Sequence, residues 1–370
     1  MPLYLDNAAT THICKEVLDE MIKSLDNFGN SESKFYSYAE DAKKDISLAR
    51  ERIATAVGCD KEEVVFTSGA TEANNLFIKG LALAHPEKKK IIISSIEHSS
   101  IYETCKYLES NGYNLVEIPV DNKGLIDLDV LDKLLDDNTL FVSIIWVNNE
   151  IGTIQNIKMI DDICSKHKVL FHSDATQAFG KVRINMSEYK ALKLLTFTSH
   201  KIYGPKGIGT LIVRKEDGVK LKLVPLFHGG EQENNYRAGT LSNELIVGFG
   251  KACELMNDNF EDNHYKIINL EKRLIELLRE KFTDKLIINN DFNERVSGII
   301  NVQIKGITNM VLLKKLAPYI AASTGSACGI SKPSRVLKAI GLSDNEINCS
   351  IRLSLSHYQN ENDYDIIQKI

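Results

Sequence analysis

Residues 192–205, LKLLTFTSHKIYGP, join an apolar run to a cluster of polar side chains. The apolar run predicts a buried strand, and Lys201 follows at the point where that strand should end. Open α/β sheets bind their ligands just beyond the carboxyl ends of their strands. A lysine placed there can condense with an aldehyde, which is a main catalytic use of lysine. Taken alone, the stretch favours an exposed lysine in a turn over a catalytic lysine. The surrounding sequence has to distinguish between the two.

The composition favours a globular protein of two domains. The chain has 370 residues, and single cores rarely grow that large. Apolar residues make up 43% and charged residues 26%, as in soluble globular proteins. The formal net charge of −5 gives no sign of direct nucleic-acid binding, and no apolar run is long enough for a membrane span. The first residues lack the pattern of a signal peptide, so we expect a cytoplasmic protein.

The cysteines are scattered and form no CxxC pair. This arrangement favours reduced thiols over a disulfide framework or a zinc site, and no metal site is expected. Most of them should be buried, because free cysteine is among the most buried residue types. The cysteines are Cys14, Cys59, Cys105, Cys164, Cys253, Cys328 and Cys349.

Outward from Lys201, short apolar runs alternate with helical patterns between residues 60 and 215. That alternation is typical of a mainly parallel sheet with helices on both faces. The expected strands are 64–66, 91–93, 141–145, 169–171, 194–197 and 211–213. Residues 263–281 repeat leucine and isoleucine at helical spacing, and 297–304 alternate like a half-buried strand. A smaller α+β domain is therefore expected to begin near residue 256.

Polar groups follow several of these strands. Residues 68–75, SGATEANN, look like a turn that opens a helix, where free N–H groups could hold a phosphate or a hydroxyl could simply cap the helix. His98 could stack on an aromatic cofactor or shuttle a proton, and could equally be a histidine satisfied by its neighbours. Asp174 needs a partner for its charge at a buried strand end, unless it caps a helix.

One cofactor uses all of these groups together. Pyridoxal phosphate needs a lysine for its aldehyde, a carboxylate for its pyridine nitrogen and an anion cradle for its phosphate. It also needs a hydrogen-bond partner for its ring oxygen and a flat group against its ring. The residues that fill these roles in turn are Lys201, Asp174, Ala70 with Thr71, Gln177 and His98. The sequence therefore predicts a pyridoxal phosphate enzyme.

Long ordered motifs support this interpretation from end to end of the chain. They are YLDNAATT (4–11), FTSGATE (66–72), VNNEIG (147–152), HSDATQ (172–177), HKIYGPKG (200–207), GGEQE (229–233), RAGT (237–240), GSAC (325–328) and SIRLS (350–354). With them the chain resembles the class V aminotransferase-type enzymes, and among these the cysteine desulfurases of the NifS/IscS type. The resemblance implies an α/β, type I PLP-transferase fold with a mainly parallel seven-stranded sheet. It also implies a large domain over 15–255, with 1–14 and 256–370 forming a smaller α+β domain.

The resemblance implies a role for each residue around the cofactor. Lys201 would bond to the aldehyde, Asp174 would pair with the pyridinium nitrogen, and His98 would stack on the ring and assist proton transfer. Two amides, those of Gln177 and Asn149, would lie near the ring oxygen. The phosphate would be held by a further set, namely Ala70, Thr71, Thr198 and His200, joined by Thr240 from the neighbouring subunit of a homodimer.

The same resemblance implies L-cysteine as the substrate. Arg352 would grip its carboxylate, with Asn7 and Asn149 also at the substrate. Cys328 would take the sulfur of the substrate as a persulfide, and L-alanine would be the other product. The sulfur would then pass to acceptor proteins, such as an iron–sulfur scaffold or sulfur-modifying enzymes of tRNA or DNA. A thiolate suits this step, and Cys328 lies in a loop of small residues rather than in an apolar run.

Two other functions stay open at this point. Another class V reaction, that of a selenocysteine lyase or an aminotransferase, would be distinguished by whether a Cys328 variant still releases sulfur. A non-catalytic docking partner of sulfur acceptors would be colourless when purified. The chain also departs from the family pattern, because GNSESKF (29–35) lacks the usual proline and histidine and the segment from Cys328 to Pro333 is slightly shortened.

Overall fold

The computed structural model describes residues 2–216, 218–325 and 333–369. Its largest element is a seven-stranded sheet with the strand order β2-β8-β7-β6-β5-β3-β4. β8 runs antiparallel to both of its neighbours, and the other neighbouring strands pair in parallel. The strands are β2 (Val64–Thr67), β3 (Lys90–Ser94), β4 (Asn114–Ile118), β5 (Thr139–Ser143), β6 (Leu170–Asp174), β7 (Leu192–Thr198) and β8 (Gly209–Val213). The expected mainly parallel seven-stranded sheet is confirmed.

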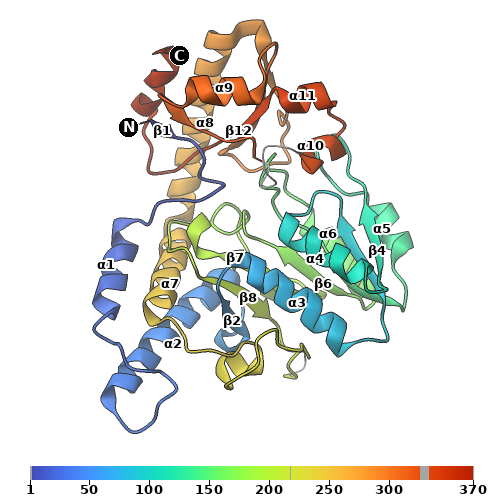
Figure 1. Ribbon diagram of the computed structural model, residues 1–370, viewed down its shortest axis with the longest axis vertical. Coiled ribbons are helices and arrows are strands. Elements are labelled where there is room, and N and C mark those ends of the chain that lie inside the picture. The colour runs from blue at the N-terminus through green and yellow to red at the C-terminus, as the bar shows by residue number, and fades with distance from the viewer. Residues whose placement is uncertain (1, 217, 326–332, 370) are drawn as a thin grey trace.

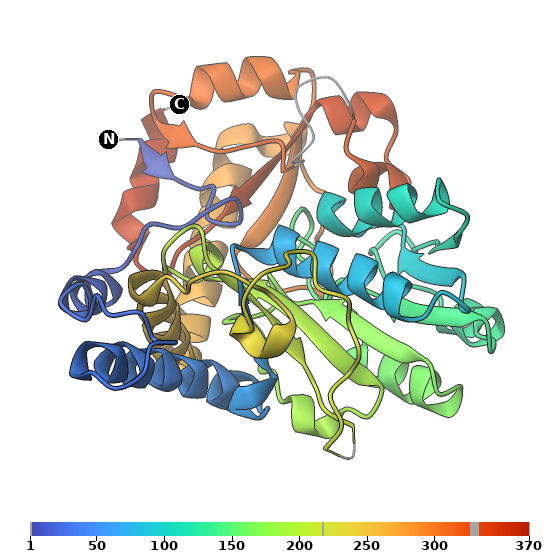
Figure 2. The same ribbon diagram turned by 60° about the horizontal axis from the view of Figure 1, so that its bottom comes forward.

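Successive residues of a strand point to opposite sides of a sheet. Apolar strand residues therefore lie on both faces of this sheet, and helices cover both. In β2, Val65 belongs to the core of one face, and Val64 and Phe66 belong to the core of the other. The first face is covered by α3 (Ala70–Ala84) and α4 (Ser99–Glu109). The second face is covered by α2 (Ser37–Val57), α5 (Leu128–Leu134), α6 (Ile157–Lys166) and α7 (Asn243–Asp258). Outside α7 lies α1 (Lys15–Ser24) (Figure 1, Figure 2).

A separate hydrophobic core forms the upper lobe in Figure 1, where both chain ends lie. It contains Leu5 together with residues between 270 and 367, and it is built on the antiparallel sheet β12-β10-β9. In the same lobe, β1 (Leu3–Tyr4) pairs in parallel with β11 (Ile320–Ala321). The lobe's other elements are α8 (Phe260–Phe282), β9 (Leu286–Ile288), β10 (Ile299–Ile304), α9 (Asn309–Leu316), α10 (Arg335–Ala339), α11 (Asp344–Asn348) and β12 (Ser350–Ser354). The exact domain bounds stay a prediction.

The apolar runs located every strand of the large sheet except β4. That strand lies at the sheet edge, and most of its residues are exposed or only partly buried, so no continuous apolar run marks it. β6 continues to Asp174 instead of stopping at residue 171, which makes this aspartate the last residue of the strand. The helix expected over 263–281 is present and longer, and the strand expected over 297–304 begins at Ile299.

The described part of the chain contains six cysteines, none of them in a disulfide. Five are buried and Cys59 is partly buried, in agreement with the expectation for small apolar side chains. Cys328 lies outside the described residues. No described helix combines the length and the apolar character that a membrane span requires.

Candidate active site

A cavity of about 750 Å³ lies between the carboxyl edge of the large sheet and the upper lobe. It forms there because β3, β5, β6 and β7 run in the same direction, so the residues that follow them gather at one edge. Most of the predicted site residues line it together. They are Ala70, Thr71, His98, Asn149, Asp174, Gln177, Thr198, His200, Lys201 and Arg352. Asn7 and Thr240 do not line this cavity, and Cys328 falls outside the described residues.

Lys201 ends the short 3-10 turn (Ser199–Lys201) that follows β7. Its Nζ donates hydrogen bonds to the carbonyl oxygens of Ala8 at 2.8 Å and Ala9 at 2.5 Å. Burial, assisted by the nearby Arg352 guanidinium, lowers the pKa of Lys201 to about 8. A lysine that releases its proton this close to neutral pH can attack an aldehyde as the free amine.

Asp174 is a buried carboxyl residue at the end of β6. The residue is 3% exposed. Its Oδ2 accepts from Asn74 Nδ2 at 3.0 Å, and its Oδ1 accepts from the Thr176 N–H at 2.9 Å. Among the described residues it forms no ion pair. Because a buried carboxylate is costly without a cation, a protonated ring nitrogen in the cavity would supply the missing partner.

A hydrogen-bond network connects Asp174 to His98. Asn74 Nδ2 also donates to Ser100 Oγ at 2.9 Å, and that oxygen lies 2.8 Å from His98 Nδ1. The Ser100 N–H donates to the same nitrogen at 3.1 Å, so the proton of the neutral ring is on Nε2. Burial lowers the pKa of His98, which keeps the ring neutral. The network fixes the histidine ring and the carboxylate relative to each other.

The N-terminus of α3 forms an anion cradle at one end of the cavity. Gly69 precedes the helix without a side-chain cap, so the first N–H groups, those of Ala70 and Thr71, are available to an anion. Gly209 packs directly behind this turn, where a Cβ would come within 2.7 Å of the Gly69 Cα and push the turn away. Thr198, His200 and Lys206 line the same cavity, and the Thr198 hydroxyl donates to the Ile208 carbonyl at 3.0 Å. This end fits a phosphate group.

Arg352 reaches the cavity from β12, but protein groups already bind both of its Nη atoms. Its Nη2 lies 2.7 Å from Asp6 Oδ1, and its Nη1 donates to the Asn149 carbonyl at 2.8 Å. Ser323 Oγ donates to the same Asp6 oxygen at 2.8 Å. The buried Nε–H of Arg352 has no partner among the described residues. A carboxylate that enters the cavity therefore competes with Asp6 for the guanidinium.

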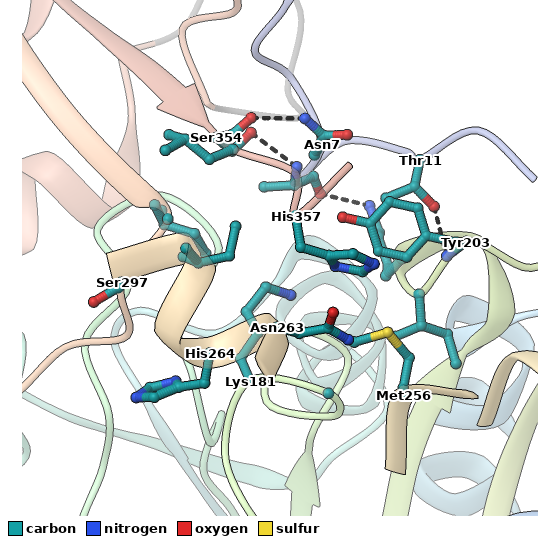
Figure 3. A pocket seen from close by; sticks show the side chains of 18 of the residues that line it. Asn7, Thr11, Lys181, Tyr203, Met256, Asn263, His264, Ser297, Ser354 and His357 are labelled. Atoms are coloured by element: carbon teal, nitrogen blue, oxygen red, sulfur yellow. Dashed lines mark hydrogen bonds between the residues drawn. The ribbon is translucent and has the colours of Figure 1, made fainter. Parts of the chain in front are cut away.

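Two predicted residues lie away from the main cavity. Asn7 lines a smaller cavity of about 50 Å³, which Lys201 also lines and which Figure 3 shows from close by. The Asn7 amide donates to the Ser354 carbonyl at 2.9 Å. Thr240 is exposed in the loop before α7. Its predicted role requires a second subunit and stays a prediction.

Sequence reasoning missed three polar residues that shape this site. Asn74 lies inside α3, Asp6 lies in the N-terminal segment, and Glu97 precedes His98. Burial raises the pKa of Glu97 to about 8, so this carboxyl group is neutral at pH 7. Its Oε1 accepts from the Ile145 N–H at 2.7 Å, which fixes a residue that lines the main cavity. The motif YLDNAATT was the one signal that could have pointed to Asp6.

Known proteins resemble this chain over its full length. The family model described as Aminotransferase class-V matches residues 3–367. A protein of Methanosarcina thermophila named "Cysteine desulfurase IscS" is 42% identical over 373 residues, covering 100% of this chain and 90% of its own. The solved structure "NIFS-LIKE PROTEIN" has a TM-score of 0.92 and 33% identity, covering 100% of this chain and 98% of its own. The solved structure "SspA in complex with cysteine" has a TM-score of 0.85 and 36% identity, covering 97% and 100%.

The cofactor of such enzymes is pyridoxal 5′-phosphate, and the cavity suits each part of it. Lys201, with its lowered pKa, would bind the aldehyde, Asp174, which has no ionic partner among the described residues, would pair with the ring nitrogen, and the uncapped start of α3 would hold the phosphate. The seven-stranded sheet and the second lobe match the solved NifS-like fold. Because the family model and the fold both extend over nearly the whole chain, this protein belongs to the class V aminotransferase family of pyridoxal phosphate enzymes.

Proposed function

We propose that this chain is a cysteine desulfurase. It converts L-cysteine to L-alanine and carries the removed sulfur on Cys328 as a persulfide. The observation that carries the proposal is that Lys201, Asp174 and Arg352 line one cavity, which suits pyridoxal phosphate beside the carboxylate of an amino acid. Gly325, which is close to Cys328 in sequence, lines the same cavity. The relative named as a cysteine desulfurase and the neighbour solved with cysteine support this choice of substrate.

Three residues of the sheet edge would handle the protons of the reaction. Bound pyridoxal phosphate supplies an electron sink for the charge that develops at the α-carbon of the substrate. Asp174 would hold the proton on the ring nitrogen, because its own carboxylate is buried without a cationic partner among the described residues. Lys201 would hold the aldehyde of the resting enzyme, and its free amine would take the α-proton of the substrate. His98, which is fixed and neutral, would offer its Nε2 proton for proton transfer.

Cys328 and Arg352 would handle the substrate. Arg352 binds the substrate carboxylate with its guanidinium. The Cys328 thiolate attacks the substrate sulfur, so that an S–S bond forms while the bond from sulfur to the β-carbon breaks. The electron pair of the broken bond stays with the carbon skeleton, which is protonated to alanine. An acceptor protein, of the iron–sulfur scaffold type or a tRNA- or DNA-sulfur modification enzyme, then removes the sulfur from the persulfide.

A homodimer is the proposed working unit. Exposed apolar side chains gather on α1, on α2 and on the segment between them. They are Leu18, Ile22, Leu25, Phe28, Phe35, Tyr36 and Tyr38. A second copy would shield this surface from water and would bring its own Thr240 to the phosphate end. Light scattering should give twice the mass of the chain, and an active monomer would contradict the dimer.

Wild-type and Cys328→Ala proteins given L-cysteine test the proposed activity. Both proteins should be yellow, and borohydride should fix the cofactor to a peptide that contains Lys201. The wild type should form alanine and sulfide in the presence of a thiol reductant, and Cys328→Ala should release almost no sulfide because it lacks the attacking thiolate. Lys201→Ala is the control that removes the covalent link to the cofactor. Sulfide release from Cys328→Ala at the wild-type rate would rule out the proposed nucleophile.

A further inference from the structure

A second lysine lies behind Lys201 and has no part in the chemistry described so far. Lys181 lines the smaller cavity, together with Lys201 and His357. In the view of Figure 3, Lys181 lies below this cavity, and Asn7 and Ser354 lie above it. The Lys181 Nζ donates a hydrogen bond to Gln177 Oε1 at 3.2 Å. Lys181 therefore contacts a predicted cofactor residue from the side away from the main cavity.

The amide of Gln177 is held from both ends. Its Nε2 donates to the Ala8 carbonyl at 2.8 Å, and a carbonyl can only accept. Its Oε1 faces the Lys181 ammonium, which can only donate. Turning the amide over would set N–H against ammonium and oxygen against oxygen, and both hydrogen bonds would be lost. The surroundings therefore permit one orientation of the amide, with Nε2 toward Ala8 and Lys201.

Gln177 also lines the main cavity, and its NH₂ group carries a second hydrogen beyond the one given to Ala8. We propose that Lys181 is a positioning residue, which fixes Gln177 so that this second hydrogen is donated to the ring oxygen of bound pyridoxal phosphate. The inference rests on the proposed function, because it requires the cofactor to occupy the main cavity.

The charge of Lys181 acts in the same direction as its hydrogen bond. A cation that binds the amide oxygen polarises the amide, which strengthens the N–H as a donor. A positive charge nearby also favours the ionised form of the ring oxygen. Burial, together with the neighbouring Lys201, lowers the pKa of Lys181 to about 8, so the ammonium form predominates at neutral pH.

The visible absorbance of the holoenzyme, titrated against pH, tests this role. Lys181→Met keeps an unbranched side chain up to Cε but removes the donor and the charge. The pH midpoint of the absorbance change should therefore rise by about half to one unit. Lys181→Arg also offers only donors and should restore a midpoint near that of the wild type. Lys158→Met is the control, because Lys158 pairs with Asp162 on the exposed surface of α6 and should leave the midpoint unchanged.

Binding of pyridoxal phosphate to the apoprotein gives a second readout. The dissociation constant should rise about 3- to 10-fold in Lys181→Met, as expected when one hydrogen bond is lost, and should stay near the wild-type value in Lys181→Arg. If Lys181 had only a structural role, Lys181→Met would have a lower melting temperature than the wild type but an unchanged pH midpoint of the absorbance change.

That unmoved midpoint would overturn the positioning role and leave the proposed function intact. A wild-type protein that takes up no pyridoxal phosphate would overturn both. If Lys181→Met does not fold, Lys181→Gln replaces it, because its amide can accept as well as donate and no longer fixes Gln177. An unchanged midpoint in that variant would equally overturn the proposal.

Discussion

The two sides of the main cavity are built differently. On the sheet side, Asp174 and His98 are joined through Asn74 and Ser100, and the Asp174 carboxylate has no cationic partner in the part of the chain that the structure describes. On the lobe side, Arg352 is already paired with Asp6. The sheet side is thus organised before a ligand binds, whereas the lobe side has to exchange an internal ion pair for the carboxylate of the substrate. Cofactor binding and substrate binding therefore respond differently to mutation.

The largest expected effect lies on the sheet side. Asp174→Asn should lower turnover by about 10³-fold, because a neutral amide does not hold the ring proton by charge and several pKa units of interaction are lost. The turnover number and the melting temperature, measured together, separate this loss from unfolding. Near-normal turnover would show that the sheet side is not organised around a ring cation.

The pH dependence of cofactor uptake tests Lys201. Because the pKa of Lys201 is lowered from 10.5 to about 8, half of the amine is free near pH 8 and the free fraction levels off above that pH. Apoprotein mixed with pyridoxal phosphate should gain absorbance at a rate that is half-maximal near pH 8, where an ordinary lysine would have about 100-fold less free amine. Arg352→Met should move the levelling-off to higher pH, because Arg352 contributes to the lowered pKa. A rate that keeps rising beyond pH 10 would contradict the lowered pKa.

A smaller effect, of opposite sign, is expected on the lobe side. Asp6→Asn removes the charge that competes for Arg352, so the KM for L-cysteine should fall by about 3- to 10-fold. The melting temperature should fall too, because a largely buried guanidinium loses its counter-charge. Asp41→Asn, at an exposed pair with Lys44, is the matched control and should change neither quantity. A raised KM in Asp6→Asn would mean that Asp6 orients Arg352 for the substrate instead of competing with it.

The smallest effect is expected for Glu97→Gln, which replaces a carboxyl group that is already neutral. Turnover at pH 7 should change less than about twofold, and the free energy of unfolding near pH 4, where Glu97 is largely protonated in the folded and the unfolded chain, should change by less than about 1 kcal/mol. The folded-state pKa of Glu97 is raised to about 8, so the folded wild type holds an extra proton between roughly pH 4.5 and pH 8. The contribution of Glu97 to stability is therefore lost as the pH rises through that range. Urea unfolding at pH 5 and pH 8 should show the Gln variant gaining relative to the wild type, and no relative gain would contradict the raised pKa.

The sheet side could be predicted from the sequence because its residues carry local signals. Asp174, Lys201 and His98 each follow an apolar run, and the direction of parallel strands then brings them to one edge. The resemblance added Arg352 but not its partner, because Asp6 and Arg352 lie 346 residues apart and their pairing depends on how the lobe packs. Asn74 was missed for a related reason. A polar residue inside a helix usually faces water, and only the approach of β6 turns it into a partner for Asp174.

The position of the N-terminal segment has a consequence for how the protein is made. The Leu5 carbonyl accepts from the Ser354 N–H at 2.7 Å, and Ala8 offers its carbonyl to both Lys201 and Gln177. At about 5–20 residues per second, a ribosome that has synthesised Asp6 needs roughly 17–70 s more to reach Arg352, 346 residues later. Until then the first residues have no β12 to bind, although the strands of the large sheet have already been made. Asp6 can therefore pair with Arg352 only after β12 has been made, so the lobe side of the main cavity is completed later than the sheet side.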